Sequence, residues 1–236
     1  MANILHLETT TLNCGVAIFS NGKIVYSKNS NEEGYSHAEN IMLFIDEAFD
    51  SSGLAKSDLD AVSVSGGPGS YTGLRIGVAT AKGICHALSI PLIAVDTLSV
   101  LFNEAKSLFP NKDAFIPMLD ARRMEVYTRT FSSSPTTPVE ALIIDETTHT
   151  QFSKFTSICF IGDGALKTQD LLNGDGRDFI ESYPKADQAL HLATSAFDLG
   201  NFVDVASYEP MYLKAFKAGV AKDPFNLRDK TNRFAK

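Results

Sequence analysis

The densest group of residues that could do chemistry is a glycine-rich segment running from Gly66 to Gly73, with the sequence Gly-Gly-Pro-Gly-Ser-Tyr-Thr-Gly. Such a turn between a strand and a helix presents backbone N–H groups and a helix N-terminus, which together bind phosphate. The segment matches neither standard phosphate pattern, because Leu74 replaces the P-loop lysine and Thr72 replaces a dinucleotide-loop glycine. Two interpretations stay open: a phosphate-binding loop, or a loop whose glycines allow close passage of a neighbouring helix.

Acidic residues stand at the ends of three apolar segments. Glu8 and Asp120 each end a short apolar run, and a third run leads into the turn Gly162-Asp163-Gly164. A carboxylate at the carboxyl end of a strand can take part in a metal–phosphate site. These acids can equally cap turns or form salt bridges. Together with the glycine-rich segment, these acids could form the active site of a small kinase or phosphatase. The residues alone do not decide between that function and a structural role.

Patterns for metal binding and for nucleophilic catalysis are missing from the sequence. The five histidines are isolated, and Ile41 stands four residues after His37, where a helical metal pair would need a second histidine. No Gly-x-Ser-x-Gly elbow occurs. The cysteines are far apart and lie in apolar segments, so they are predicted to be core residues and not disulfide partners, zinc ligands or nucleophiles. They are Cys14, Cys85 and Cys159.

Three short strands are predicted to position the first of these acids. Ile4–Leu7 and Val16–Phe19 are apolar runs joined by a Thr/Asn-rich turn, and Asn21-Gly22 predicts a tight turn before Ile24–Tyr26. The next elements are a helix with a capping box at Ser36 and Glu39, a strand over 61–65, a helix over 72–88, a strand over 92–95 and a helix over 98–108. This alternation after a meander predicts an α/β protein with a mixed sheet.

The two long helices carry more apolar side chains than one buried face requires. In the first, one stripe excludes Leu43 and Phe44, and in the second, Ile76 and Ala79 lie opposite the main stripe. A helix with two apolar sides is either sandwiched or meets a partner. The stripes are Ala38, Ile41, Met42, Ile45, Ala48 and Phe49, and Leu74, Val78, Ala81, Cys85 and Leu88.

The second half of the chain repeats the pattern of the first. Residues 115–131 again run strand, acid, turn, strand, which predicts two related lobes. We expect a first lobe over residues 1–108, which carries the protein-interaction surface, and a smaller second lobe over 109–216. The last helix of the second lobe, near 188–201, can return to the first lobe. Residues 217–236 are expected to be a mobile basic tail.

Composition and charge restrict the function classes. With 236 residues, 44% hydrophobic and 21% charged, the chain is of globular make-up. A net charge of −7 argues against autonomous nucleic-acid binding, although residues 217–236 carry six basic side chains against two acidic ones. That tail could contact a phosphate backbone or be a solvated terminus. No apolar run approaches the ~18–20 residues of a membrane span and no signal peptide is seen, so we expect a cytoplasmic protein without membrane contact.

One family carries the same motifs over most of the chain. The stretch from Ser65 to Gly83, Ser-Gly-Gly-Pro-Gly-Ser-Tyr-Thr-Gly-Leu-Arg-Ile-Gly-Val-Ala-Thr-Ala-Lys-Gly, resembles the signature of the TsaB (YeaZ) family. Further resemblances are Ser36-His-Ala-Glu39, Pro91–Leu101, Asp120-Ala-Arg-Arg-Met-Glu-Val-Tyr127 and Glu209-Pro-Met-Tyr-Leu-Lys214. The family's first strand usually ends in Asp, whereas this chain has Glu8. This departure and the missing P-loop lysine count against independent ATP hydrolysis.

The resemblance implies a fold and a function. The fold is the two-lobed actin/hexokinase/Hsp70-like (ASKHA) fold, an α/β class with mixed sheets and duplicated lobes. The function is that of a scaffold without catalysis of its own, which pairs with TsaD and recruits the ATPase TsaE. The complex modifies the adenosine beside the anticodon in ANN-decoding tRNAs. No cofactor is expected in this chain, and ATP and a metal ion are expected in the partner subunits. The catalytic relative TsaD carries a His-x-x-x-His pair, which Ile41 interrupts here.

The resemblance also implies an interface on the first lobe. Its helices pair with those of TsaD, and family members form homodimers through a similar surface. For this chain alone, both a homodimer and a monomer stay open. The residues predicted to bind the partner are Ile41, Met42, Ile45, Phe49, Ile76, Ala79 and Gly83. Two alternatives remain: an independent ASKHA-type kinase or phosphatase, and a glycoprotease-like metallopeptidase, which the missing metal pair disfavours.

Overall fold

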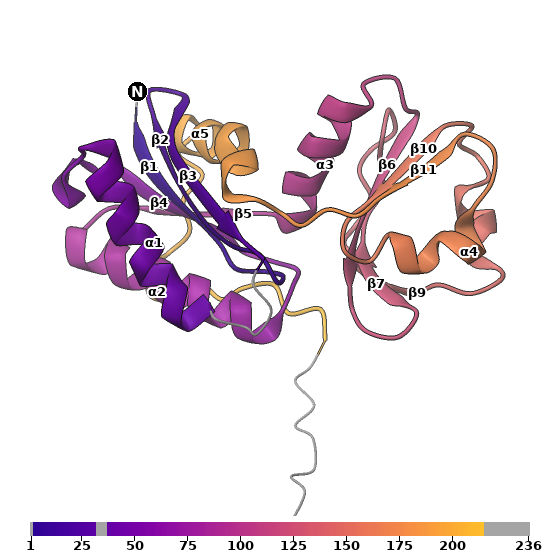
Figure 1. Cartoon of the computed structure of the whole chain (residues 1–236), viewed down its shortest axis with the longest axis horizontal. Coiled ribbons are helices and arrows are strands. Elements are labelled where there is room, and N and C mark those ends of the chain that lie inside the picture. Colours follow the sequence, from indigo (N-terminus) through magenta and orange to yellow (C-terminus); the bar gives the residue numbers. More distant parts are fainter. Residues whose placement is uncertain (1, 32–36, 215–236) are drawn as a thin grey trace, which may run out of the picture.

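The chain forms two lobes, and each is built on one mixed sheet (Figure 1). The computed structural model describes residues 2–31 and 37–214. The predicted basic tail over 217–236 and the predicted cap at Ser36 lie outside the described residues. None of the helices in the described part of the chain is both long enough and apolar enough to cross a bilayer.

The predicted meander forms one side of a five-stranded sheet. The central strand β1 (Asn3–Glu8) pairs antiparallel with β2 (Cys14–Ser20), which pairs antiparallel with β3 (Lys23–Ser30). On its other side β1 pairs parallel with β4 (Ala61–Ser65), and β4 pairs parallel with β5 (Leu92–Val95). The order is therefore β3-β2-β1-β4-β5, which confirms the predicted mixed sheet.

The second sheet repeats this order. Its path is β9-β7-β6-β10-β11, with antiparallel pairing among the first three strands and parallel pairing among the last three. The short strand β8 pairs with the beginning of β6. The same topology in both lobes confirms the predicted repeat and the predicted α/β class with mixed sheets. The strands are β6 (Ala114–Asp120), β7 (Glu125–Thr128), β8 (Phe131–Ser132), β9 (Glu140–Ile143), β10 (Ile158–Ile161) and β11 (Arg177–Ile180).

Two helices cover one face of the first sheet. They are α1 (His37–Ser52) and α2 (Tyr71–Leu88), and their buried stripes pack on β1, β2 and β4 (Figure 1). Asp46 of α1 pairs with Lys56 in the short 3₁₀ helix η1 (Lys56–Asp58). The side chains of this core include Leu5, Leu7, Val16, Ile18, Ile41, Ile45, Val62, Val64, Val78 and Cys85.

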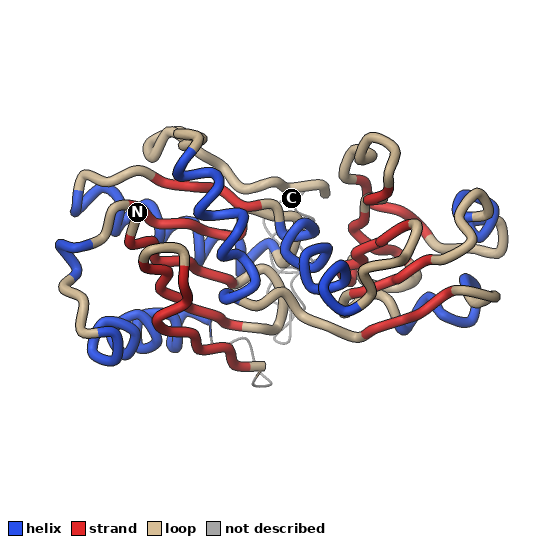
Figure 2. The backbone as a smooth tube through the Cα atoms, turned by 90° about the horizontal axis from the view of Figure 1, so that it is seen from above, coloured by secondary structure: helices blue, strands red, loops and turns tan. Residues whose placement is uncertain are grey.

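Packing of the remaining helices crosses the expected boundary between residues 108 and 109. The helix α3 (Thr97–Leu108) follows the first sheet in sequence but packs on the second. Conversely, the 3₁₀ helix η4 (Ala186–Ala189) and α5 (Leu190–Asp198) return to the open face of the first sheet, as the views from two directions show (Figures 1 and 2). The other short helices are η2 (Thr148–Phe152), η3 (Leu166–Thr168) and α4 (Gln169–Leu172).

A segment without regular structure, residues 203–214, follows α5 and is called the strap below. It starts at the edge of the first sheet, where Val203 forms an antiparallel bridge with Leu92. Lys82 of α2 holds its middle, because its Nζ donates to the carbonyl oxygens of Ala206 and Tyr208 over 3.0 and 3.1 Å. The strap therefore lies along α2 and is tied to it.

The strap ends on the second lobe. Lys214 Nζ donates to the carbonyl oxygen of Ala121 over 3.2 Å and pairs with the carboxylate of Glu125, both in the β6–β7 region. Residues 203–214 thus connect the edge of the first sheet to the second lobe.

Candidate functional site

The glycine-rich segment joins β4 to α2, as predicted, and lies against the β1–β2 turn. Ser70 caps α2, since its hydroxyl accepts a hydrogen bond from Gly73 N over 3.3 Å. Ser70 N donates to the carbonyl oxygen of Thr10 over 2.6 Å, and Thr9 Oγ1 donates to the carbonyl oxygen of Gly73 over 2.8 Å. Two of the N–H groups that a phosphate loop would present to a ligand, those of Ser70 and Gly73, are therefore engaged by the protein itself.

Close approach of two backbones explains two of the glycines. A Cβ on Gly69 would lie 2.5 Å from the carbonyl oxygen of Thr10, and one on Gly73 would lie 1.9 Å from that of Thr9. Both distances are far shorter than a real carbon–oxygen contact. The structure thus supports the interpretation as a close-passage loop, although the neighbour is a turn between strands and not the expected helix.

The strap closes the other side of the glycine-rich segment. Met211 N donates to the carbonyl oxygen of Gly66 over 2.8 Å. The ring of Tyr212 lies 4.9 Å from that of Tyr71, and Arg75 stacks over Tyr71 at 4.2 Å. The segment is therefore enclosed between the β1–β2 turn and the strap.

Glu8 is completely buried at the end of β1. Its carboxylate accepts hydrogen bonds from Thr10 N over 2.7 Å, from Thr10 Oγ1 over 2.5 Å and from Ser65 Oγ. No cation in the described part of the chain lies within ion-pair distance of it. Burial raises the pKa of Glu8 to about 7, and the hydrogen bonds offset only part of that rise.

His6 continues the same buried row. It shares a face of β1 with Glu8, because alternate residues of a strand point to the same side. His6 Nδ1 lies 2.9 Å from Ser63 Oγ, and Nε2 lies 3.5 Å from Ser65 Oγ. Burial lowers the pKa of His6 to about 3, so the imidazole is neutral near pH 7. The row is a polar network inside the first lobe, covered by η4 and α5.

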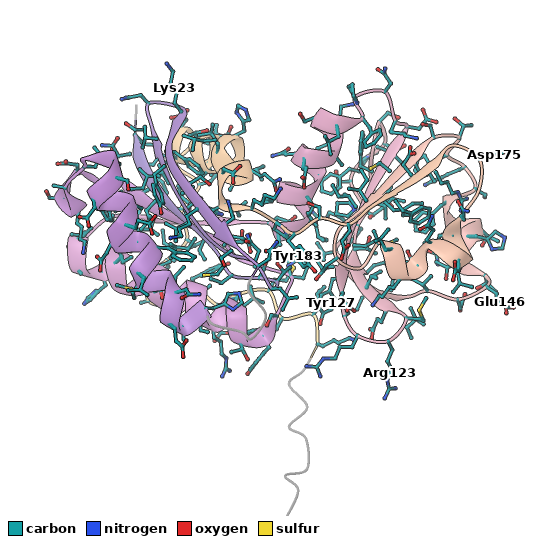
Figure 3. The ribbon with its side chains drawn as sticks, in the orientation of Figure 1. Lys23, Arg123, Tyr127, Glu146, Asp175 and Tyr183 are labelled. Carbon is teal, nitrogen blue, oxygen red and sulfur yellow. The ribbon has the colours of Figure 1, made fainter. Side chains whose placement is uncertain are left out.

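The acids of the second lobe are engaged in turns. Asp163 accepts a hydrogen bond from Asp120 N over 2.9 Å, and Asp120 in turn accepts one from Arg122 N over 2.7 Å and pairs with Lys167. Burial raises the pKa of Asp163 to about 6. Tyr183 lies where the two lobes approach each other (Figure 3). Burial, followed by the charge of Asp163, raises the pKa of Tyr183.

The predicted nucleotide-type constellation is thus not assembled as a binding site. Glu8 is hydrogen-bonded by Thr10 and Ser65, and Asp120 and Asp163 are engaged by the β6–β7 region and Lys167, whereas Asn13 Oδ1 in the β1–β2 turn is buried without a hydrogen-bond partner in the described part of the chain. Among residues 2–31 and 37–214, no three His, Cys, Asp or Glu side chains gather where they could hold a metal ion.

Three of the residues predicted to bind a partner are core residues. Ile41, Ile45 and Phe49 are buried between α1 and the first sheet. The expectation is wrong for these three, because the stripe they share is the face with which α1 packs on β2 and β3. The buried face also includes Phe44, which the helical wheel excludes. Lys28 of the edge strand β3 extends over its ring, with Nζ 4.5 Å from the centroid.

The other predicted residues lie on accessible parts of the two helices. Met42 is 47% exposed, Ala79 and Gly83 are exposed, and Ile76 is partly buried. No atom lies within 4 Å of the position that a Cβ on Gly83 would take. Whether these residues bind a partner stays a prediction.

Two further residues belong to the same outer surface. Leu43 is 63% exposed in the middle of the outer face of α1, and Ala87 continues the exposed line of Ala79 and Gly83 along α2. A spacing of four residues along the helix places Ala87 on the same side of α2 as Ala79 and Gly83. The position of Leu43 outside the buried stripe is the signal in the sequence for its exposure.

Comparisons with known proteins agree with this architecture. A family model described as TsaD, tRNA N6-adenosine threonylcarbamoyltransferase, matches residues 31–208. The tRNA threonylcarbamoyladenosine biosynthesis protein TsaB of Escherichia coli is 28% identical over 89% of this chain and 94% of its own length. TsaB of Bacillus subtilis is 33% identical over 53% of each chain.

A solved structure shows the same fold. It is an uncharacterized protein from Pseudomonas aeruginosa with similarity to peptidase YEAZ, 24% identical, with a TM-score of 0.76 over 91% of this chain and 100% of that one. The family model covers most of the chain, and curated TsaB proteins match its sequence. The chain therefore belongs to the TsaB (YeaZ) family, within the family described by the TsaD-type tRNA N6-adenosine threonylcarbamoyltransferase model.

Proposed function

We propose that this chain is a scaffold subunit, without catalysis of its own, in threonylcarbamoylation of the adenosine next to the anticodon of ANN-decoding tRNAs. In this proposal it pairs with a TsaD homologue and recruits the ATPase TsaE. ATP and a metal ion belong to those partners, and tRNA is contacted through the complex. The chain alone forms a homodimer through the same surface.

One observation supports the proposal: the outer surface of α1 and α2 combines a line of small residues with exposed apolar side chains. On α2, Ala79, Gly83 and Ala87 are exposed at spacings of four residues, so one side of the helix has almost no side-chain bulk. Glycine in the interior of a helix costs about 0.5–1 kcal/mol relative to alanine. Nothing within the described lobe approaches Gly83, so the fold itself gives no reason for that cost.

Exposed apolar side chains stand on the neighbouring helix. Met42 is 47% exposed and Leu43 is 63% exposed on α1, which covers the same sheet face as α2. Helices pack by inserting the side chains of one into the grooves of the other. Large side chains on α1 beside a small-residue line on α2 supply both a ridge and a groove, and two helices of a partner could complete the packing.

Charge indicates what surrounds the apolar contact on the partner. The exposed side of α1 also carries Glu39, Asp46, Glu47 and Asp50, of which Asp46 and Glu47 pair with Lys56 and Lys28. Complementary potentials increase association rates and exclude wrong partners. We therefore propose that the partner surface has a basic rim.

The pairing is tested by size-exclusion chromatography with light scattering, on the chain alone and mixed with the TsaD homologue of the same organism. A one-to-one complex that replaces a homodimer is the expected result. Failure to associate, together with metal-dependent ATP turnover by the chain alone, would contradict the scaffold function and favour the small-enzyme alternative.

Two variants are expected to break the pairing while the fold remains intact. Leu43→Asp places a charge in the apolar contact, and Gly83→Leu fills the groove on α2, so each is expected to weaken the complex at least tenfold. Ile143→Asp is the matched control, because Ile143 on the second lobe is 65% exposed, close to the exposure of Leu43. Equal affinity of Leu43→Asp and Ile143→Asp in a titration by biolayer interferometry would place the interface elsewhere.

A further inference from the structure

A cavity in the second lobe has features of a ligand site that the proposed scaffold role does not use. It lies at the end of the lobe where α3 finishes and where β6 and β10 begin (Figure 1). Its volume is about 720 Å³, within the range of roughly 300–1,000 Å³ typical of small-molecule pockets. The cavity shares no residue with the outer face of α1 and α2.

Three lysines from three different elements line this cavity. Lys106 is in the last turn of α3, Lys112 is in the loop before β6, and Lys154 is in the loop before β10. They are separated in sequence and brought together by the fold. Such a gathering of like charges is unfavourable by itself unless an anion is placed among them. It is also unusual in a chain whose net charge is −7.

The protein leaves part of this positive charge uncompensated, since three lysines stand against two acids, Asp113 and Asp178. Lys112 pairs with Asp178, whereas neither Lys106 nor Lys154 has an acid within ion-pair distance among the described residues. The acid of the cavity, Asp113, accepts hydrogen bonds from Thr156 N over 3.2 Å and from Thr156 Oγ1 over 2.5 Å, which lower its pKa, so it keeps its negative charge and offsets part of the charge of the lysines.

Aromatic rings hold the two unpaired ammonium groups in place. Lys106 Nζ lies 5.2 Å from the ring centroid of Phe115 and donates to the carbonyl oxygen of Pro110 over 2.7 Å. Lys154 Nζ lies 4.9 Å from the ring centroid of Phe155. A cation over a ring is attracted to it but keeps its full charge. Both ammonium groups can therefore still bind an anion.

The cavity also offers an apolar surface and hydroxyl groups. Phe102 stacks on Phe131 at 4.3 Å and meets Phe115 edge-on at 5.4 Å, and Phe155 is only half-buried. The turn after β8 adds three consecutive serines, residues 132–134. A ligand that used all of these features would combine a flat apolar ring system, hydroxyl groups and a compact negative charge.

We infer that this cavity binds a nucleotide, with the phosphate held by Lys106 and Lys154 and the base stacked on the half-buried rings of Phe102 and Phe155. Lysine binds phosphate as a point charge, and aromatic side chains accept any base by stacking. The same chemistry is offered by a free mononucleotide and by an unpaired nucleotide of an RNA strand. Inorganic phosphate would use the lysines and leave most of the cavity unfilled.

The test is calorimetric titration of the full chain with AMP, compared with adenosine and with inorganic phosphate. AMP is expected to bind at least tenfold more tightly than either, since each lacks one half of the recognised group. The variant Lys106→Gln/Lys154→Gln is expected to lose at least tenfold in AMP affinity. Its matched control, Lys23→Gln/Lys56→Gln, removes the same charge from the first lobe and is expected to bind AMP like the wild type.

A second substitution separates the two halves of the site. Phe155→Ala is expected to weaken AMP binding while inorganic phosphate binding stays unchanged. A single-stranded oligoadenylate that binds more tightly than AMP, with a steeper salt dependence, would assign the site to RNA, and the reverse order would assign it to a free nucleotide. Either order supports nucleotide recognition.

Three results would overturn the inference: unchanged AMP affinity in the double-lysine variant, equal affinity for adenosine and AMP, or no binding of either AMP or oligoadenylate. Displacement of AMP by a polyglutamate peptide at equal concentration would show general anion binding and would also overturn it. Pairing of the double-lysine variant with the TsaD homologue, measured in parallel, keeps this outcome separate from the scaffold proposal.

Discussion

Replacing Gly73 with alanine is expected to lower the free energy of unfolding by about 3 kcal/mol or more, because the new methyl group has no room. Its Cβ would lie 1.9 Å from the carbonyl oxygen of Thr9, which is backbone and cannot rotate away. To accept the methyl group, the β1–β2 turn would have to separate from α2. That movement would also break the hydrogen bond of 2.8 Å from Thr9 Oγ1 to the carbonyl oxygen of Gly73.

The matched control lies on the same helix. Gly83 is exposed, and no atom lies within 4 Å of the position that an added methyl group would take. Gly83→Ala is therefore expected to stabilise the chain by about 0.5–1 kcal/mol through helix propensity alone. Urea unfolding followed by circular dichroism measures both variants. A loss below about 1 kcal/mol for Gly73→Ala would show that the turn and the helix are not held in close contact.

Replacing Glu8 with glutamine is expected to change the pH dependence of stability. Folding raises the pKa of Glu8 from 4.5 to about 7, because the buried carboxylate is desolvated. The folded state therefore binds this proton more tightly than the unfolded state. The contribution of this proton to the free energy of unfolding is complete below pH 4.5 and is lost as the pH rises from 4.5 to 7. For a pKa shift of this size, the loss amounts to about 3 kcal/mol.

Glutamine imitates the protonated form of Glu8. Its amide can donate to Ser65 Oγ, and its carbonyl oxygen can still accept from Thr10. We expect the variant and the wild type to have similar stability near pH 4.5, and the variant to be more stable by about 3 kcal/mol at about pH 8. The difference between the two unfolding curves isolates Glu8, because His6 is present in both.

His6 acts in the opposite direction and provides an internal check. Burial lowers its pKa from 6.5 to about 3, so its contribution to stability is present above pH 6.5 and is lost as the pH falls toward 3. Both proteins should therefore lose stability in acid. Denaturant unfolding at about pH 4.5, 6 and 8 measures the difference, and parallel curves over this range would contradict the protonation of Glu8 in the folded state.

Local patterns in the sequence predict most of the fold. Alternation and turn residues locate the meander, and the repeated order of strand, acid and turn at Glu8 and Asp120 predicts the second lobe. These features depend on residues close together in the chain. The return of the last helix to the first lobe is named only as an option, and the packing of α3 on the second sheet is not predicted. Both depend on contacts between distant residues, which a single sequence records only weakly.

The candidate site shows the same limit. A helical wheel shows that α1 has two apolar sides but cannot show which side the sheet occupies, so it places Ile45 at the partner and leaves Leu43 out. The sequence also does not predict which segment packs against the glycine-rich segment, since nothing near Gly73 indicates a contact with Thr9. The lysines of the second-lobe cavity are far apart in sequence and converge only after folding.

The return of η4 and α5 to the first sheet has a consequence for synthesis on the ribosome. Chains are made from the N-terminus, and domains generally fold as units as they emerge. Here the sheet face that carries Ile4, Phe19 and Ile93 is covered by Ala186, Ala189 and Ala193. The first lobe is begun first, but it completes its core only after the second sheet has been synthesised. The earlier-made half of the protein must therefore wait, with one face of its sheet uncovered, for the later-made half.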